Sequence, residues 1–99
     1  MNYFYARVSS KDQNEARQLE AAEQWSKKEG IQFNEIFIDK ESGKNFDRTN
    51  YQLMKSKLRE GDLIVVKSID RFGRNYEMII DEWSFLTKRM HVDIVVIDL

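Results

Sequence analysis

Short apolar runs alternate with longer amphipathic segments along this chain. The apolar runs are rich in β-branched and aromatic residues, as strands are, and the segments between them carry apolar residues at helical spacing. The pattern predicts strands at residues 3–8, 33–38, 63–67 and 92–97. It predicts helices at residues 12–30, 47–61 and 76–88.

Capping signals place the helix ends. Asp12 and Glu15 have the spacing of a capping box, and Gly30 is a suitable stop for the helix that follows them. Asp47 is the expected N-cap of the next helix, which should stop near Gly61. The apolar stripes of the helices include two tryptophans, Trp25 and Trp83, which we expect to lie in the core.

Regular alternation of strand and helix is typical of a parallel sheet with right-handed crossovers. The runs LIVVK and VDIVVI suit central strands that are covered on both faces. We therefore expect an α/β fold: a three-layer flavodoxin-like domain with a mostly parallel four-stranded sheet, in the order 2-1-3-4, flanked by helices. The chain stops at Leu99, directly after the last predicted strand, and we interpret it as a fragment.

Composition narrows the classes of protein. With 99 residues the chain fits one domain. It has no cysteine and no apolar run of the roughly 18 residues that a membrane span needs, so we expect a cytoplasmic protein without membrane contact. Its net charge of −1 gives no general support for nucleic-acid binding. Support for nucleic-acid binding would have to come from how the 16 basic residues are distributed.

The carboxyl ends of the strands at the switch point of the sheet are where a ligand should bind. Arg7 and Ser9 share one face at the end of the first strand, because side chains alternate along a strand. Asp70 and Arg71 follow the third strand, and Arg48 starts from the same edge. This convergence of arginines in an acidic chain predicts an anionic ligand, a phosphate.

The segment SIDRFGR also predicts an anionic ligand. It places Arg71 and Arg74 three residues apart, which we expect to be one face of the opening turn of a helix. Positive charge at a helix N-terminus is unfavourable by about 0.3–1 kcal/mol. Two arginines there make sense if something negative binds between them.

A serine beside guanidinium groups suggests nucleophilic attack on an anionic centre. The usual histidine base is missing, because the only histidine, His91, precedes the fourth strand at the opposite edge. Metal-assisted hydrolysis also fits poorly, with no cysteine and no tight carboxylate cluster in the sequence. Electrostatic catalysis by arginine remains, and contacts of that kind contribute about 10³–10⁵ in rate.

Three motifs, YARVSSKDQ, DKESGKNFDR and SIDRFGRN, stand in this order in the chain. Together they resemble the catalytic domain of serine recombinases of the resolvase/invertase type, over residues 3 to 98. The resemblance implies that Ser9 is the nucleophile. It implies that Arg7, Arg71 and Arg74 bind the scissile phosphate with Arg48 close by, and that Asp70 orients an arginine or assists proton transfer to the leaving oxygen.

The resemblance also implies the reaction and the partners. Members of the family recombine DNA at specific sites, through a 5′-phosphoserine link and a free 3′-hydroxyl, without metal, nucleotide or other cofactor. Their partners are double-stranded DNA and further copies of the protein, which form dimers and tetramers. The family continues into a dimerisation helix and a helix-turn-helix domain. Residues 1–99 would thus be a truncated catalytic domain, inactive as an isolated fragment.

Simpler interpretations stand beside several of these residues. Either hydroxyl of Ser9 and Ser10 would also serve to start a helix, although the alignment with Arg7 favours Ser9. Asp70 would also serve as an N-cap, and Arg74 as a solvated surface residue. Asp39 either orients an arginine or ends its strand. Lys57 is left out of the site, since a lysine whose stem covers apolar surface is as good an explanation.

Two other functions compete with recombination. One is a catalytically silent recombinase fragment that acts as an interaction module. The other is a small phosphatase-like relative of flavodoxin, which would carry a glycine-rich phosphate loop after the first strand. The segment YARVSSKDQ contains no glycine, which counts against that last possibility.

Overall fold

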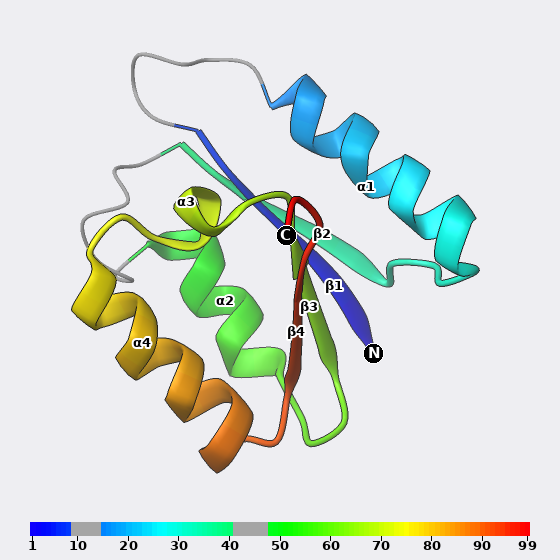
Figure 1. Ribbon diagram of the computed structural model, residues 1–99. Coiled ribbons are helices and arrows are strands. Elements are labelled where there is room, and N and C mark those ends of the chain that lie inside the picture. The colour runs from blue at the N-terminus through cyan, green and yellow to red at the C-terminus, as the bar shows by residue number, and fades with distance from the viewer. Residues whose placement is uncertain (9–14, 41–47) are drawn as a thin grey trace.

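The computed structural model describes residues 1–8, 15–40 and 48–99 of the chain. Strands and helices alternate along it, as the hydrophobic pattern predicts (Figure 1). In chain order the elements are β1 (Asn2–Arg7), α1 (Ala16–Glu29), β2 (Glu35–Asp39), α2 (Thr49–Lys57), β3 (Leu63–Val66), α3 (Ile69–Phe72), α4 (Tyr76–Ser84), the π-helical turn η1 (Phe85–Arg89) and β4 (Asp93–Val96).

All four strands are parallel and lie in the spatial order β2-β1-β3-β4. The central strand β1 places Phe4 beside Ile36 of β2 and Val65 of β3. The predicted fold class and strand order are therefore confirmed. The chain goes from β1 to β2 on one side of it and then crosses back past β1 to β3 on the other side. The strand order therefore reverses between β1 and β3, which is the switch point of the sheet.

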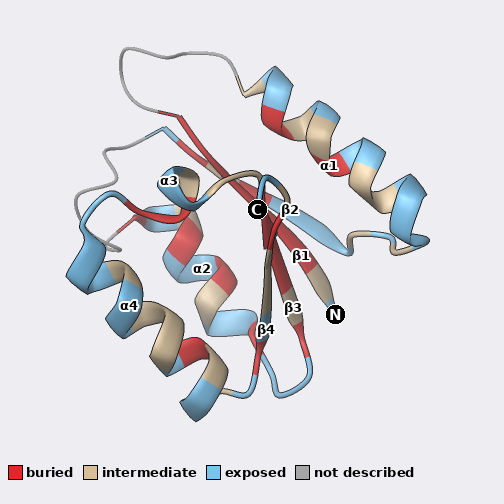
Figure 2. Ribbon diagram, in the orientation of Figure 1, coloured by how far each residue is buried: buried red, intermediate tan, exposed pale blue. Residues whose placement is uncertain are grey.

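Helices cover both faces of the sheet and complete three layers. Figure 1 shows α1 on one face and α2, α3 and α4 on the other. Figure 2 shows that the strands in the middle of the sheet are buried. Alternation along β1 sends Tyr3 and Tyr5 into the core that also holds Tyr51 of α2, whereas Phe4 and Ala6 pack with Ala22 of α1. Both tryptophans are half-buried and pack against a core, as expected: Trp25 on the α1 side and Trp83 on the other.

The helix ends confirm some of the capping predictions. α1 ends at Gly30, whose φ of 69° lies in the left-handed region and whose N–H donates to the Ser26 carbonyl. Asp12 lies outside the described residues, and Glu15 at the N-cap position makes no side-chain capping bond. No helix in the described ranges is long and apolar enough to cross a membrane.

The second helix is shorter than predicted. Asp47 lies outside the described residues, and Arg48 occupies the N-cap position of α2. The helix ends at Lys57 and does not continue towards Gly61, because Leu58 has an extended backbone with φ −65° and ψ 139°. This conformation places the side chain of Leu58 in the core, where it is 8% exposed.

The third predicted helix divides into two forms of helix. α4 runs to Ser84 and passes directly into η1, where the N–H of Met90 donates to the carbonyl of Phe85, five residues earlier. The wider π turn rotates the following residues relative to α4, and Leu86 within it is fully buried in the core.

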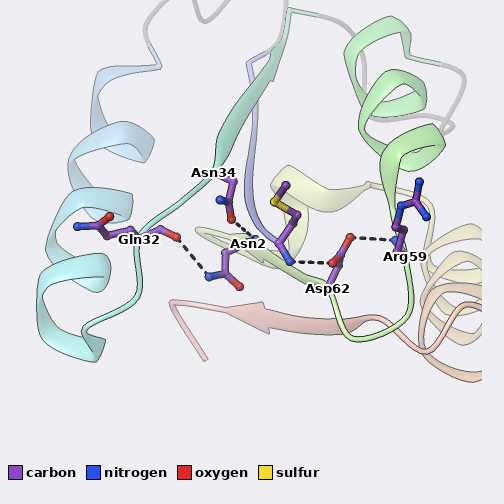
Figure 3. A network of polar contacts seen from close by, with 6 residues as sticks. Asn2, Gln32, Asn34, Arg59 and Asp62 are labelled. Carbon is purple, nitrogen blue, oxygen red and sulfur yellow. Dashed lines mark hydrogen bonds and ion pairs between the residues drawn. The ribbon is translucent and has the colours of Figure 1, made fainter.

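Polar contacts close the amino edge of the sheet, far from the predicted site (Figure 3). The Asp62 carboxylate accepts from the N–H of Arg59 at 2.9 Å and pairs with the Met1 amino group at 2.8 Å. The backbone N–H of Asn2 donates to the Asn34 side chain at 2.7 Å. These contacts join the start of β1 to the segments that precede β3 and β2.

Lys57 also lies at this amino edge, as its helix direction predicts. Its Nζ donates to the carboxylate of Glu35, the first residue of β2, at 2.9 Å. The same Nζ lies 5.7 Å from the centroid of the Phe37 ring. The lysine stem therefore covers apolar surface and ends in a surface ion pair, which supports the structural interpretation of this residue.

Met54 and Leu53 offer a matched test of the core. Met54 is fully buried and Leu53 is 48% exposed, although they are neighbours on α2. Met54→Ala should lower the free energy of unfolding by about 2–4 kcal/mol because it leaves a cavity. Leu53→Ala should cost less than about 1 kcal/mol. Urea denaturation measures both, and equal costs would contradict this packing.

Candidate active site

The carboxyl ends of three strands bring the predicted site residues to one edge of the sheet. β1 ends at Arg7 and β2 at Asp39, while β3 leads into α3, which carries Asp70 and Arg71. The predicted nucleophile Ser9 lies outside the described residues. In the sequence it follows Arg7, the last residue of β1, by two positions.

Arg7 lies at the centre of a group of arginines. Its side chain is 3% exposed, and its Nη2 donates to the carbonyl of Asp70 at 2.6 Å. Burial lowers the pKa of Arg7, and the positive charges of Arg48, Arg71 and Arg74 lower it further. The other three arginines therefore lie close enough to Arg7 for their positive charges to act on it, and a bound anion would offset that effect.

Arg48 is buried more deeply, at 1% exposed. Its Nη2 donates to the Phe72 carbonyl at 2.7 Å and its Nη1 to the Tyr5 hydroxyl at 3.1 Å. The guanidinium lies 5.5 Å and 5.3 Å from the ring centroids of Tyr5 and Tyr51. In this conformation Arg48 supports its neighbours from within the core and presents almost no surface to a ligand.

Asp39 holds this arrangement together. Its carboxylate accepts the Tyr5 hydroxyl at 2.8 Å and the backbone N–H groups of Asn50 and Tyr51 at 2.9 and 2.8 Å. It therefore caps the N-terminus of α2, where Arg48 itself provides no side-chain cap. The Tyr5 hydroxyl thus links Asp39 to Arg48, and Asp39 also joins β2 to α2, so the contacts are compatible with both interpretations of this residue.

Asp70 lies within α3 and is not an N-cap. Ser68 precedes that short helix, and its hydroxyl donates to the Asp70 carboxylate. This hydrogen bond lowers the pKa of Asp70, and the positive charges of Arg71 and Arg7 act in the same direction against partial burial. A side chain with a lowered pKa is a carboxylate at neutral pH, so Asp70 is suited to orient a cation.

Arg71 and Arg74 do not share a helix, contrary to the prediction. α3 ends at Phe72, Gly73 is extended, and α4 begins after Asn75, whose side chain accepts from the N–H of Met78. Asn75 is a strong N-cap, so the chain starts a new helix there instead of continuing the first. Arg71 therefore points to the Arg7 carbonyl at 3.1 Å, whereas Arg74 is exposed in the connection between the helices.

The Ser68–Asp70 contact predicts a pH effect. Ser68→Ala removes the largest cause of the lowered pKa, so the pKa of Asp70 should rise. A depressed carboxyl pKa contributes stability that is lost as pH falls through it, so this acid-side loss should shrink in the variant. NMR titration of the Asp70 carboxyl measures the shift. Ser56→Ala, whose hydroxyl contacts only the Leu53 carbonyl, is the control and should leave it unchanged.

Sequence reasoning missed two side chains of this site, Tyr5 and Gln18. In a strand, Tyr5 reads as one apolar residue among several, and only the fold shows its hydroxyl between Arg48 and Asp39. Gln18 is 2% exposed and contacts the backbone of Arg7. Its spacing from Ala22 was a usable signal, because a glutamine four residues before a buried alanine lies on the core face of the helix.

The site offers positive charge to a negatively charged group. Arg71 is half-buried and Arg74 is exposed, whereas Arg7 and Arg48 are buried in the protein. Fixed guanidinium groups are well suited to bind phosphate oxygens and to stabilise the charge that develops when one of their bonds breaks.

Known proteins are similar to this chain in sequence and in fold. Residues 2–99 match the family model for the resolvase N-terminal domain. The chain is 44% identical to the transposon Tn3 resolvase of Escherichia coli over 71 residues, which are 72% of this chain and 36% of that protein. It is 38% identical to the transposon Tn21 resolvase of Escherichia coli over 92 residues, 92% of this chain and 45% of that protein. The chain thus spans less than half the length of these curated relatives.

Solved structures agree with the sequence matches. The C-terminal catalytic domain of ISC1926 TnpA, an IS607-like serine recombinase, superposes with a TM-score of 0.76 at 32% identity, over 97% of this chain and 66% of that one. The N-terminal catalytic domain of TP901-1 integrase, at 19% identity, shares the fold with a TM-score of 0.75 over 98% of this chain and 76% of that one. The chain belongs to the resolvase family, as a serine recombinase N-terminal domain.

Proposed function

We propose that this chain is the catalytic domain of a site-specific DNA recombinase in which the Ser9 hydroxyl attacks a DNA phosphate. One observation carries the proposal: at the edge of the sheet where β1 ends, two residues before Ser9 in the sequence, Arg71 binds the Arg7 carbonyl at 3.1 Å and the charges of Arg48, Arg71 and Arg74 all act on Arg7. The names of its relatives, which are resolvases and a serine recombinase, support DNA as the substrate.

The proposed reaction is a transesterification. The Ser9 oxygen forms a bond to phosphorus and gives up its proton, while the bond from phosphorus to the 3′ oxygen breaks and that oxygen gains a proton. The product is a 5′-phosphoserine link with a free 3′-hydroxyl. Attack by a 3′-hydroxyl reverses the step and rejoins DNA, so the phosphate ester is conserved and neither a metal nor a nucleotide is consumed.

The arginines have separate tasks in this proposal. Arg71 and Arg74, which approach the surface, contact the phosphate oxygens, and Arg7 adds positive charge from behind. Arg48 fixes Tyr5 and the end of α3, to which it is hydrogen bonded. Asp70 orients an arginine, because its lowered pKa makes it a poor proton donor at neutral pH.

Recombination sets the number of copies required. One serine cuts one strand, and two duplexes contain four strands, so the exchange of both requires four subunits. We propose that the complete protein acts on double-stranded DNA as a tetramer assembled from dimers.

The proposal is tested by trapping the covalent intermediate. The longest natural form of the protein is mixed with DNA fragments selected for binding to it, in EDTA, and the reaction is quenched with denaturant. We expect a protein–DNA adduct that carries the 5′ end of the cut strand, with the other end a free 3′-hydroxyl. Cut DNA with a 5′-hydroxyl and protein on the 3′ end would contradict the proposed chemistry.

A further inference from the structure

The side chain of Gln18 binds both peptide groups of Arg7. Its Nε2 donates to the Arg7 carbonyl at 2.9 Å, and its Oε1 accepts from the Arg7 N–H at 3.2 Å. Gln18 lies in the first turn of α1 and is 2% exposed. One buried side chain thus connects the helix after the Ser9 segment to the strand before it.

The end of β1 needs such a partner. β1 pairs with β2 as far as Arg7 and Asp39, but it pairs with β3 only as far as Phe4 and Val65. The next residue, Val8, donates its N–H to Asp39 on the β2 side, so the N–H and carbonyl of Arg7 point towards the β3 side. β3 ends at Val66, and on that side the Gln18 side chain binds the N–H and the carbonyl of Arg7.

At this position the amide of Gln18 makes the two hydrogen bonds that a neighbouring strand would make. It presents one donor and one acceptor, as a peptide group does, and it satisfies both groups of Arg7 at once. Packing alone does not call for a glutamine, because Ala22 and Trp25 on the same face of α1 are apolar. A buried amide is favourable here only because it is hydrogen bonded.

This contact lies where the catalytic arginines meet. The Arg7 carbonyl also accepts from Nη1 of Arg71 at 3.1 Å, and the Arg7 side chain donates to the Asp70 carbonyl. The orientation of the Arg7 peptide therefore affects two arginines, Arg7 itself and Arg71.

We propose that Gln18 is a positioning residue for strand cleavage: it fixes the backbone at Arg7, and with it the positions in which Arg7 and Arg71 act on the phosphate. The inference rests on the proposed function, since it assigns Gln18 a task in that reaction. Gln18 touches no reacting atom and acts through Arg7.

The test compares Gln18→Met with Gln24→Met in the longest natural form of the protein. Both changes replace an amide by a thioether of similar length on α1, but Gln24 is exposed. We expect Gln18→Met to fold and to bind DNA as the parent does, while its rate of adduct formation at saturating DNA falls roughly 10- to 100-fold through misplacement of the reacting groups. Gln24→Met should react at the parent rate.

Hydrogen exchange of the Arg7 amide gives a second readout. The exchange should accelerate in Gln18→Met and stay unchanged in Gln24→Met, because only the first variant removes the acceptor of that N–H. A residue needed only for folding would lower the unfolding midpoint without slowing cleavage by the folded protein at saturating DNA.

Each outcome decides between the claims. If Gln18→Met does not fold, Gln18→Glu, which keeps the size and the acceptor, takes its place. A parent rate in either folded variant refutes the positioning role, and failure of both to fold beside a folded Gln24→Met assigns Gln18 a structural role only. A parallel Ser9→Ala reaction separates the claims: adducts that persist in it would remove the proposed function itself.

Discussion

Ser9→Ala is expected to abolish the covalent protein–DNA adduct while DNA binding stays within about threefold of the parent. In the proposed reaction the hydroxyl oxygen of Ser9 bonds to phosphorus, and alanine has no atom to replace it. The variant leaves the proposed phosphate-binding arginines unchanged, and binding should therefore survive. Denaturing gels measure the adduct, and gel shifts measure binding.

Ser10→Ala is the matched control for this variant. It removes the same atom one residue later in the chain, on the other face if the strand direction continues. We expect it to form adducts at a rate within about tenfold of the parent. Adducts that vanish in Ser10→Ala and persist in Ser9→Ala would move the nucleophile to the neighbouring residue.

The fold was predictable because each element carries a strong local signal. Apolar runs such as residues 63–67 could only be strands at that length, and their alternation with helices left few topologies. The errors in the prediction lie at the ends of helices, where a single residue can determine whether the helix continues. From the sequence, Leu58 could have continued α2. In the structure its backbone is extended and its side chain packs in the core.

The candidate site was predictable only in part. The strand order determines which segments meet at the carboxyl edge, so the gathering of Arg7, Arg71 and Arg74 follows from topology. The conformation and exposure of each arginine do not follow from the topology. The shared helix face proposed for Arg71 and Arg74 was wrong because Asn75 competes as a helix start, a choice that depends on how α4 packs.

The supporting residues were hidden because their partners are far apart in sequence. Asp39 reaches Tyr5 across 34 positions, and Arg48 reaches Tyr5 across 43. The sequence can indicate that a tyrosine or glutamine is buried, but not which groups its polar atoms bind. Only the register of β1 against its neighbours, seen in three dimensions, shows which polar groups need partners at the site.

Arg71→Ala is expected to lower the rate of strand cleavage by about 10³–10⁵ while leaving DNA binding nearly intact, because a positioned guanidinium acts mainly on the charge of the transition state. The fold should tolerate the change. Its Nη1 bond to the Arg7 carbonyl is lost, but Gln18 still donates to the same oxygen. The stability cost should thus stay below about 1.5 kcal/mol.

Arg48→Met should behave differently, and the contrast tests the separate tasks of the two arginines. Arg48 is fully buried, and its loss leaves the Phe72 carbonyl without that donor, so unfolding should become easier by about 2–4 kcal/mol. Arg59→Met, at the exposed amino edge, is the control for both and should change neither rate nor stability appreciably.

Cleavage at the parent rate in Arg71→Ala would exclude that arginine from the reaction. Arg71→Lys discriminates further, because a lysine keeps the charge but lacks the planar fork that binds two phosphate oxygens at once. A rate restored by lysine would mean that charge alone suffices, whereas a rate that stays low would mean that the geometry fixed by the Arg7 carbonyl and α3 is what the reaction uses.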